Sequence, residues 1–303
     1  LLKAIGRKEY SLSSWKQHLL NPKEANKFAI DWIFVVDCLN FSFWSDDKFQ
    51  LTYKGNTFTG YWSLCAAINR AIDENIPIVD PSYFSTLNID QLKYILRGDN
   101  ENREMPLLEE RLKILHEAGS VLMNKFNGSF MNCIALAENK CENLLTLIVD
   151  NFSSFRDEAL FLSRKVSFYK RAQILIADIW ACFEGKGIGY FEDIDTLTMF
   201  ADYRVPQVLA YFGVLEYSAA LMKRLQRNEM MISGESDEVE IRGASILAIN
   251  LICSEIKRIY KECGESNAFI NDIIADFYLW DYRREFSEEI DKIPFHKVRS
   301  IYY

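Results

Sequence analysis

The sequence has few of the residues that interrupt helices, with 13 Gly and 6 Pro among its 303 residues. A turn-rich β architecture needs more of both, so this shortage favours long helices. Hydrophobic residues make up 49% of the chain and include 21 Phe, 15 Tyr and 6 Trp, enough to fill a large core. Neither a linker rich in Gly, Ser or Pro nor an internal repeat divides the chain, so we expect a single helical domain over residues 1–303.

Positive charge is also in short supply. The chain has 35 Lys and Arg against 43 Asp and Glu, and its net charge is −8. A protein that holds polymeric nucleic acid needs a broad basic surface, so we expect no stable nucleic-acid complex. A small substrate with one phosphate stays compatible with this charge, because one local cluster of Lys and Arg is enough to bind it.

The sequence offers little material for metal or disulfide chemistry. His18, His116 and His296 lie far apart, and none has a second ligand at helical spacing, so we expect no metal site. The seven cysteines are odd in number, lack a C-x-x-C pair and lie mostly in apolar runs. This pattern predicts reduced, buried thiols in a cytoplasmic protein, with the nucleus as an alternative location. A Cys–His nucleophile pair stays open, although nothing marks out one cysteine.

Long apolar runs are missing as well. No uninterrupted apolar stretch approaches the ~20 residues needed to span a bilayer, and residues 1–8 resemble neither a signal peptide nor an anchor. We therefore expect no membrane association, and we expect a monomer. Because the sequence starts at Leu1 without an initiator Met, we expect further residues to precede it in the natural chain.

Apolar periodicity predicts a mainly α protein with a small β-hairpin. Residues 8–30 fit helices interrupted at Asn21-Pro22, whereas 31–37 fit a strand or a buried helix equally well. Alternation over 50–61 predicts the hairpin, and the polar stretch 228–240 predicts a surface loop. Further helices are expected over 62–74, 90–97, 104–125, 129–150, 154–162, 168–184, 206–214, 216–226, 242–263 and 267–283.

Asp202 is the most informative candidate residue. It precedes a helix begun by Pro206, a residue that is pre-set for a first helical position. A carboxylate near such a helix start lies beside unsatisfied backbone N–H groups, which favour its ionised form. Two interpretations stay open. Asp202 is a helix cap, the common role of Asp at this place, or it is an oriented charge that stabilises a developing sugar cation beside the aromatic Phe200.

Two glycine- or cation-rich segments are candidates for binding an anion. Residues 164–171 place four cations and two aromatics at an expected helix entrance, which fits a phosphate or carboxylate site or a solvated first turn. Residues 185–189 have the composition of a phosphate loop. They follow a helix instead of a strand and lack Gly-Lys-Ser/Thr, so a helix-stop loop is favoured.

A carboxylate face is expected near the C-terminus. Asp272, Asp276 and Trp280 recur every four residues and therefore share one helix face. Asp276 lies among apolar residues, and a buried carboxylate needs a protein cation or a cationic ligand as its partner. The arginines at 283–284 explain Asp281 more easily than Asp276.

Several long segments resemble, in order, the queuosine salvage protein family of queuosine 5′-phosphate N-glycosylase/hydrolases, with eukaryotic members the most similar. The resemblance implies a helical fold similar to helix-hairpin-helix DNA glycosylases and no metal or organic cofactor. It also implies hydrolysis of queuosine 5′-monophosphate to ribose 5-phosphate and queuine, a base that a separate enzyme reinserts into tRNA. The segments that carry the resemblance are 31–44, 60–67, 166–175, 199–207, 278–282 and 293–296.

The resemblance also implies roles for the candidate residues on the sugar and base. Asp202 matches the family's catalytic aspartate, acting as nucleophile or as ion-pair stabiliser of an oxocarbenium-like state. Phe200 is expected to stack on the deazaguanine. Asp276, with Asp281 nearby, is expected to pair with the cationic secondary amine and the diol of queuine. His18 matches a pocket position, with a surface histidine as the alternative.

Three cations are candidates for the 5′-phosphate: Lys170, Arg171 and Arg204. Arg204 fits an orienting role for Asp202 equally well. Two rival functions stay open. A DNA glycosylase conflicts with the acidic charge, since base-flipping enzymes need a basic face for the duplex. A non-catalytic helical nucleotide- or tRNA-binding protein is the other alternative.

Overall fold

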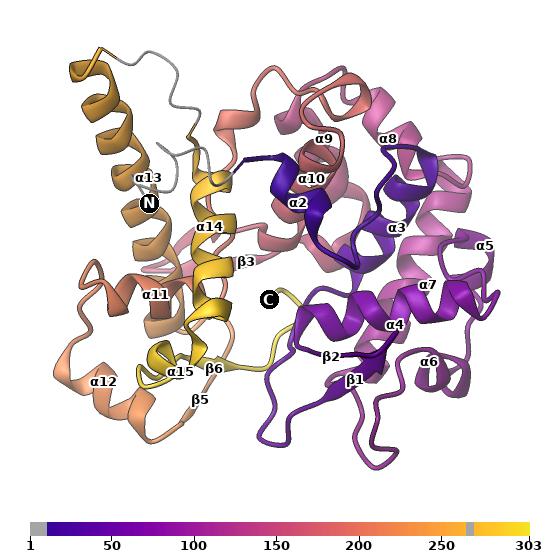
Figure 1. Ribbon diagram of the computed structural model, residues 1–303, viewed down its shortest axis with the longest axis horizontal. Helices are drawn as coiled ribbons and strands as arrows, with labels where there is room; N and C mark the ends of the chain where they lie inside the picture. The colour runs from indigo at the N-terminus through magenta and orange to yellow at the C-terminus, as the bar shows by residue number, and fades with distance from the viewer. Residues whose placement is uncertain (1–10, 265–269) are drawn as a thin grey trace.

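The computed structural model describes residues 11–264 and 270–303. Within these ranges the strands form two-stranded sheets only, and the remaining regular structure is helical. The prediction of a mainly α fold is therefore confirmed. Figure 1 shows α13, α14, α11 and α12 on one side of the molecule, α3 to α8 with the β1–β2 hairpin on the other, and α10 between them.

The first half of the chain carries most of the short helices. Its elements are α2 (Ser13–Gln17), α3 (Lys27–Cys38), β1 (Gln50–Tyr53), β2 (Asn56–Thr59), α4 (Tyr61–Asp73), α5 (Pro81–Phe84), α6 (Ile89–Ile95), α7 (Leu108–Lys125), α8 (Phe130–Leu136) and α9 (Cys141–Asn151).

The second half carries the longest helix and two further sheets. Its elements are the 3-10 turn η1 (Ser153–Phe155), β3 (Glu158–Phe161), β4 (Arg164–Ser167), α10 (Lys170–Cys182), the 3-10 turns η2 (Gly187–Gly189) and η3 (Ile194–Thr196), α11 (Val205–Tyr211), α12 (Ala219–Gln226), β5 (Met230–Met231), α13 (Ser236–Glu262), α14 (Asp272–Glu285), α15 (Ser287–Ile290) and β6 (Lys297–Val298).

The ambiguous run 31–37 is a buried helix. The Asn26 side chain caps α3 by accepting a hydrogen bond from the Ala29 N–H. Because α3 packs against α7, α8 and α10, its residues are buried almost all round, and this removes the polar face by which a helix is usually recognised. The β1–β2 hairpin is confirmed, with Lys54 and Gly55 both at positive φ in its turn.

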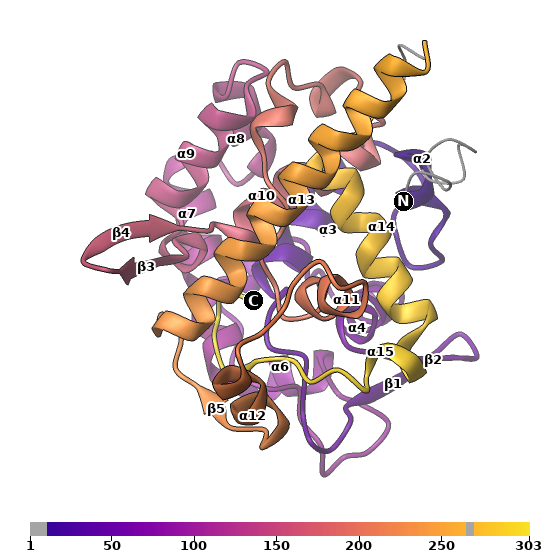
Figure 2. The ribbon, with the colours of Figure 1, turned by 90° about the vertical axis from the view of Figure 1, so that its left-hand side faces the viewer.

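The expected helix 154–162 is wrong. This segment contains η1 and then β3, which pairs with β4 in a hairpin that projects from the body in Figure 2. Leu160 and Leu162 in this hairpin are 72% and 81% exposed, so they contribute no buried helix face. The turn residues Leu162 and Ser163 both adopt positive φ, as a tight hairpin needs, but neither is a residue that predicts such a turn.

Three other boundaries needed correction. The expected helix 129–150 is two helices, because the chain turns at Glu138 and Asn139 with positive φ. The expected loop 228–240 ends early: α13 starts at Ser236, where acidic side chains in the first turn suit the helix dipole. In the expected helices 8–30, α2 is short and 18–26 are not helical.

The helix expected over 267–283 corresponds to α14, which begins after the capping residue Asn271. The residues 8–10 and 267–269 of the expected helices lie outside the described residues. The segment after α10 is a helix stop, as expected, because Gly185 takes positive φ and donates its N–H to the Trp180 carbonyl. The prediction of buried thiols is confirmed for six cysteines, whereas Cys263 is exposed. No helix of the described ranges is long and apolar enough to cross a membrane.

Candidate active site

A cavity of about 1210 Å³ lies where α2, α4, α10, α11 and α14 meet the segments 40–49 and 291–297. Three buried carboxylates line it: Asp178 on α10, Asp202 before α11 and Asp276 on α14. We call these three residues the acidic floor. Because they are 24 to 98 positions apart in the sequence, only the packing of the helices brings their charges together.

Asp202 is both a cap and a cavity residue. Its Oδ1 accepts hydrogen bonds from the N–H groups of Arg204 (2.9 Å) and Val205 (2.8 Å), where α11 begins. The residue is 8% exposed and lines the cavity. Within the described residues Oδ2 receives no hydrogen bond, so one oxygen is fixed by the helix start and the other is available to a ligand. The two interpretations of Asp202 are therefore compatible.

Asp276 has a partner that the sequence did not reveal. Its Oδ1 accepts a hydrogen bond from the Phe200 N–H at 3.0 Å, so α14 helps to hold the segment that carries Asp202. Burial raises the pKa of Asp276 well above its usual range, and the charge of Asp202 raises it further. Phe200 itself is buried, lines the cavity and lies 5.9 Å from the ring of Phe277.

Lys170 is buried at the start of α10 and lines the same cavity. Burial lowers the pKa of Lys170, and the strongest opposing influence is the negative charge of Asp202. Asp37 and Asp276 also favour the charged ammonium. A cation at a helix start opposes the helix dipole, so these carboxylates are the groups that favour the charged form of Lys170. Lys170 is thus a counter-ion of the acidic floor.

Asp178 is the third member of the acidic floor, and Asp37 is a further buried acid close to it. Asp178 accepts a hydrogen bond from the indole N–H of Trp15 at 3.0 Å, and burial raises its pKa well above the usual range. Asp37 lies behind the cavity and accepts one bond from Asn40 at 3.1 Å; burial raises its pKa to about 7. Neither residue was expected from the sequence. Each is an acid within an apolar run, and the same pattern identified Asp276.

Arg171 does not reach the cavity. Its guanidinium is buried and donates to the main-chain carbonyls of Asp37, Cys38 and Ser154. The structure therefore gives no support to the expectation that Arg171 binds the phosphate, because both terminal nitrogens of its guanidinium bond main-chain carbonyls. The cation cluster 164–171 is divided as well: its first residues lie on β4, where exposed Lys165 pairs with Glu158.

Aromatic side chains form one wall of the cavity. The His18 ring stacks on Trp62 with centroids 3.3 Å apart, and Trp62 contacts Trp280 at 5.8 Å. Burial lowers the pKa of His18 to about 4, with help from the charges of Arg284 and Lys23. His18 is therefore a neutral ring at neutral pH and part of the cavity, not a surface histidine.

Three arginines stand at the rim of the cavity: Arg204, Arg283 and Arg284. Asp291 forms ion pairs with Arg283 and, at 3.5 Å, with Arg204. Burial lowers the pKa of Arg284 to about 10, and the neighbouring Arg283 charge lowers it further. We call these three residues the rim arginines. Arg204 does not orient Asp202 through its guanidinium, which bonds Gln207 at 2.9 Å; its backbone N–H makes that contact.

The acidic face of α14 is only partly in the cavity. Asp276, Trp280 and Asp281 line it, with Asp281 exposed and close enough to favour the charged form of Arg284. Asp272 faces α13 instead, where Cys253 interacts with its carboxylate. No group of His, Cys, Asp and Glu in the described part of the chain has the arrangement of a metal site.

Comparison with known proteins identifies similar sequences over the whole chain. The profile of the family described as "Queuosine salvage protein" matches residues 20–303. The chain is 49% identical to the queuosine 5′-phosphate N-glycosylase/hydrolase of Bos taurus over 308 residues, which cover 100% of this chain and 90% of that protein. The protein of the same name from Schizosaccharomyces pombe is 41% identical, and the match covers 96% of this chain and 88% of that protein. The one from Sphaerobacter thermophilus is 35% identical, and the match covers 100% of this chain and 90% of that protein.

Proposed function

The chain belongs to the queuosine salvage protein family, and from this we propose that it hydrolyses the N-glycosidic bond of queuosine 5′-monophosphate and releases queuine for salvage into tRNA. The observation that carries the proposal is Asp202, a buried carboxylate with one oxygen fixed by the start of α11 and the other in the cavity. The names of the relatives favour this enzyme over a DNA glycosylase or a non-catalytic binding protein.

Asp202 is the residue that acts on the sugar. Cleavage of an N-glycosidic bond passes through an oxocarbenium-like state, and a fixed anion on the sugar face stabilises it. Covalent attack by Oδ2 and an ion pair with water as the nucleophile use the same carboxylate. In both cases the hydrogen bonds to the Arg204 and Val205 N–H groups keep the charge in place before the bond breaks.

Phe200 and the acidic floor bind the base. The ring of Phe200 offers a face on which the deazaguanine stacks, next to the aromatic wall of His18 and Trp62. Asp276 pairs with the cationic amine of queuine. Burial raises the pKa of Asp276, and an arriving cation favours the ionised form, so substrate binding itself supplies the missing positive charge. Asp281, at the rim, binds the diol.

The rim arginines bind the 5′-phosphate. Asp291 pairs with two of these three arginines, Arg204 and Arg283, and guanidinium groups suit phosphate geometry. Arg204 keeps the role expected from the sequence. We propose that Arg283 and Arg284 take the place of Lys170, because the negative charges that act on its ammonium are those of Asp202, Asp37 and Asp276.

The direct test is incubation of the purified protein with queuosine 5′-monophosphate, following free queuine by mass spectrometry. We expect queuine and ribose 5-phosphate in equal amounts, and no release of a damaged base from duplex DNA. Folded protein that releases no queuine from queuosine 5′-monophosphate over hours would contradict the proposal.

Replacing Arg284 by Gln tests the phosphate site. We expect KM for the nucleotide to rise ~10-fold with little change in kcat, because a charge-assisted hydrogen bond contributes about 1.5–3 kcal/mol to binding. Steady-state kinetics on nucleotide and nucleoside measure this effect, and the nucleoside constants should stay as in the wild type. Arg258→Gln is the matched control, since Arg258 is exposed on α13 and pairs with Glu255 and Glu262. Equal effects on both substrates would exclude a phosphate role for Arg284.

We also propose that the protein acts as a monomeric single domain in the cytoplasm or nucleus, without a stable nucleic-acid complex. One main cluster of buried hydrophobic residues draws on elements from Leu20 to Ile290, which supports a single domain. Buried free thiols suit a reducing compartment. The net charge of −8 disfavours a nucleic-acid partner.

A further inference from the structure

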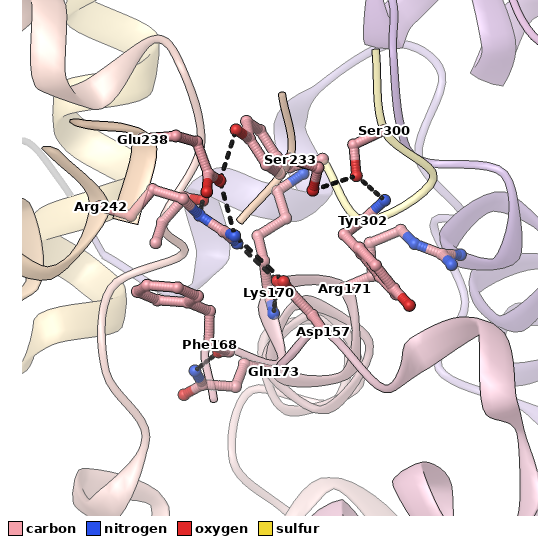
Figure 3. A network of polar contacts seen from close by, with 12 residues as sticks. Asp157, Phe168, Lys170, Arg171, Gln173, Ser233, Glu238, Arg242, Ser300 and Tyr302 are labelled. Carbon is pink, nitrogen blue, oxygen red and sulfur yellow. Dashed lines mark hydrogen bonds and ion pairs between the residues drawn. The ribbon is translucent and has the colours of Figure 1, made fainter. Parts of the chain in front are cut away.

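A buried ion-pair network lies beside the cavity and is centred on Arg242 of α13. Arg242 is 1% exposed, and its guanidinium binds Asp157 through two bonds, at 3.0 and 2.5 Å. It also bonds Glu238 at 3.1 Å and lies between the rings of Phe168 and Tyr303, at 4.0 and 4.2 Å from their centroids. Figure 3 shows Arg242 at the centre of this network, with Asp157 and Glu238 on either side.

The network touches the main chain next to Asp202 and at Lys170. Arg242 donates its Nε–H to the carbonyl of Ala201 at 2.9 Å, one residue before Asp202. Asp157 accepts a hydrogen bond from the Lys170 N–H at 3.3 Å through the same Oδ2 that binds Arg242. One guanidinium–carboxylate pair therefore connects the segment of Asp202 to the start of α10.

The segment that carries Asp202 needs such support. Residues 197–204 form no helix or strand, so no ladder of backbone hydrogen bonds fixes them. Side chains from other elements hold the segment instead: Gln173 binds Thr198, Asp276 binds the Phe200 N–H, and Arg242 binds the Ala201 carbonyl. Arg242 makes the contact that is closest in sequence to Asp202.

Stability alone is a weak reason for this network. Replacing a buried ion pair by apolar residues of similar volume is often neutral or stabilising. What a bidentate Arg–carboxylate pair provides is a fixed geometry, because the planar fork of the guanidinium sets the positions of all its acceptors. In this structure those acceptors are Asp157, Glu238 and the Ala201 carbonyl.

We propose that Arg242, acting with Asp157, is a positioning residue that fixes Asp202 relative to Lys170. The proposal rests on the proposed hydrolysis, in which Asp202 must stand at a set place on the sugar face. Substitution of Arg242 should therefore lower kcat and leave KM nearly unchanged. Most groups that hold the base and the phosphate lie on other elements, namely Asp276, Arg283 and Arg284 on α14, and they make no bond to the Arg242 guanidinium.

The test uses Arg242→Lys, which keeps the charge and loses the fork, and Asp157→Asn, which is nearly isosteric and keeps an acceptor for the Lys170 N–H. We expect kcat for queuosine 5′-monophosphate to fall about 10- to 100-fold in each, the range in which a displacement near 1 Å acts, while KM stays close to wild type. Leu144→Ala is the control for a loss of stability alone. Leu144 is a core residue of α9 and does not line the cavity. The substitution should lower the melting temperature and leave kcat unchanged. A folded Arg242→Lys with wild-type kcat would overturn the proposal.

A double-mutant cycle separates positioning from a general structural effect. If Arg242 acts through Asp202, Arg242→Lys costs little further activity in an Asp202→Asn background, whereas independent effects multiply. Multiplying effects would contradict the proposal. Hydrogen exchange gives a readout without turnover: peptides covering 198–204 should exchange faster in Arg242→Lys, and those of α7 and α9 should not. Unchanged exchange at 198–204 would overturn the positioning role, whereas absence of wild-type turnover alone would overturn the proposed reaction.

Discussion

Replacement of Asp202 by Asn is expected to lower kcat for queuosine 5′-monophosphate at least ~100-fold, the scale of removing one electrostatic stabiliser from an active site. The fold should survive, because the amide oxygen of Asn can still accept the hydrogen bonds of the Arg204 and Val205 N–H groups. The change therefore removes the charge and keeps the cap. Queuine release gives the rate, and thermal unfolding reports whether the protein is intact.

A second capping aspartate provides the control for this experiment. Asp193 accepts hydrogen bonds from the N–H groups of Cys141 (2.6 Å) and Glu142 (3.1 Å) at the start of α9, and it does not line the cavity. Asp193→Asn should therefore leave kcat unchanged. Wild-type rates in Asp202→Asn would show that the assignment of Asp202 is wrong even though the family is right.

Lys170→Met is expected to reduce activity at pH 7 about 10- to 100-fold and to move the acid limb of the pH profile upward by ~1–3 pH units, the usual influence of a close opposite charge on a carboxylate pKa. Lys170 lowers the pKa of Asp276, Asp178 and Asp37, which burial raises. Without the ammonium these pKa values rise further, so the floor binds protons at a higher pH. Because the active form is the carboxylate, raising the pH should restore part of the rate.

The pH profile of kcat distinguishes this role from phosphate binding. If Lys170 were a phosphate ligand, KM for the nucleotide would rise, the nucleoside would be unaffected, and the acid limb would stay in place. Lys165→Met is the control, since exposed Lys165 lies nearby on β4 and pairs with Glu158. Lys170→Arg keeps the charge and should retain more activity than Lys170→Met. An unmoved acid limb in Lys170→Met would contradict the counter-ion role.

Local patterns in the sequence were sufficient to predict much of the fold. Alternation around Lys54-Gly55 predicted the β1–β2 hairpin, and apolar periodicity located α4, α10 and α11 within a few residues. The β3–β4 hairpin could not be predicted in this way. Its turn residues Leu162 and Ser163 are not the Asn or Gly that usually mark such a turn, and its Leu160 and Leu162 are apolar yet exposed.

The site was predictable where one residue carries its own physical reason. Asp202 stands before a helix, and Asp276 is an acid among apolar residues, so each is noticeable alone. The surroundings were not predictable, because they depend on long-range partners. Arg242 and Asp157 are 85 positions apart in the sequence. Arg171 belongs to a cation cluster in the sequence, yet both terminal nitrogens of its guanidinium bond carbonyls of α3 and η1.

The tethering of one oxygen of Asp202 has a stereochemical consequence. Because Oδ1 is held by the first N–H groups of α11, the proposed reaction has the carboxylate approach the ribose with Oδ2 alone and therefore from one face. The anomer of ribose 5-phosphate that forms first then distinguishes covalent attack by Asp202 from direct attack by water. Two successive displacements at C1′ restore the β configuration of the nucleotide, whereas direct entry of water on the face opposite the departing base gives the α anomer. In the proposed reaction, the cap of this seven-residue helix thus decides which face of the sugar the carboxylate meets.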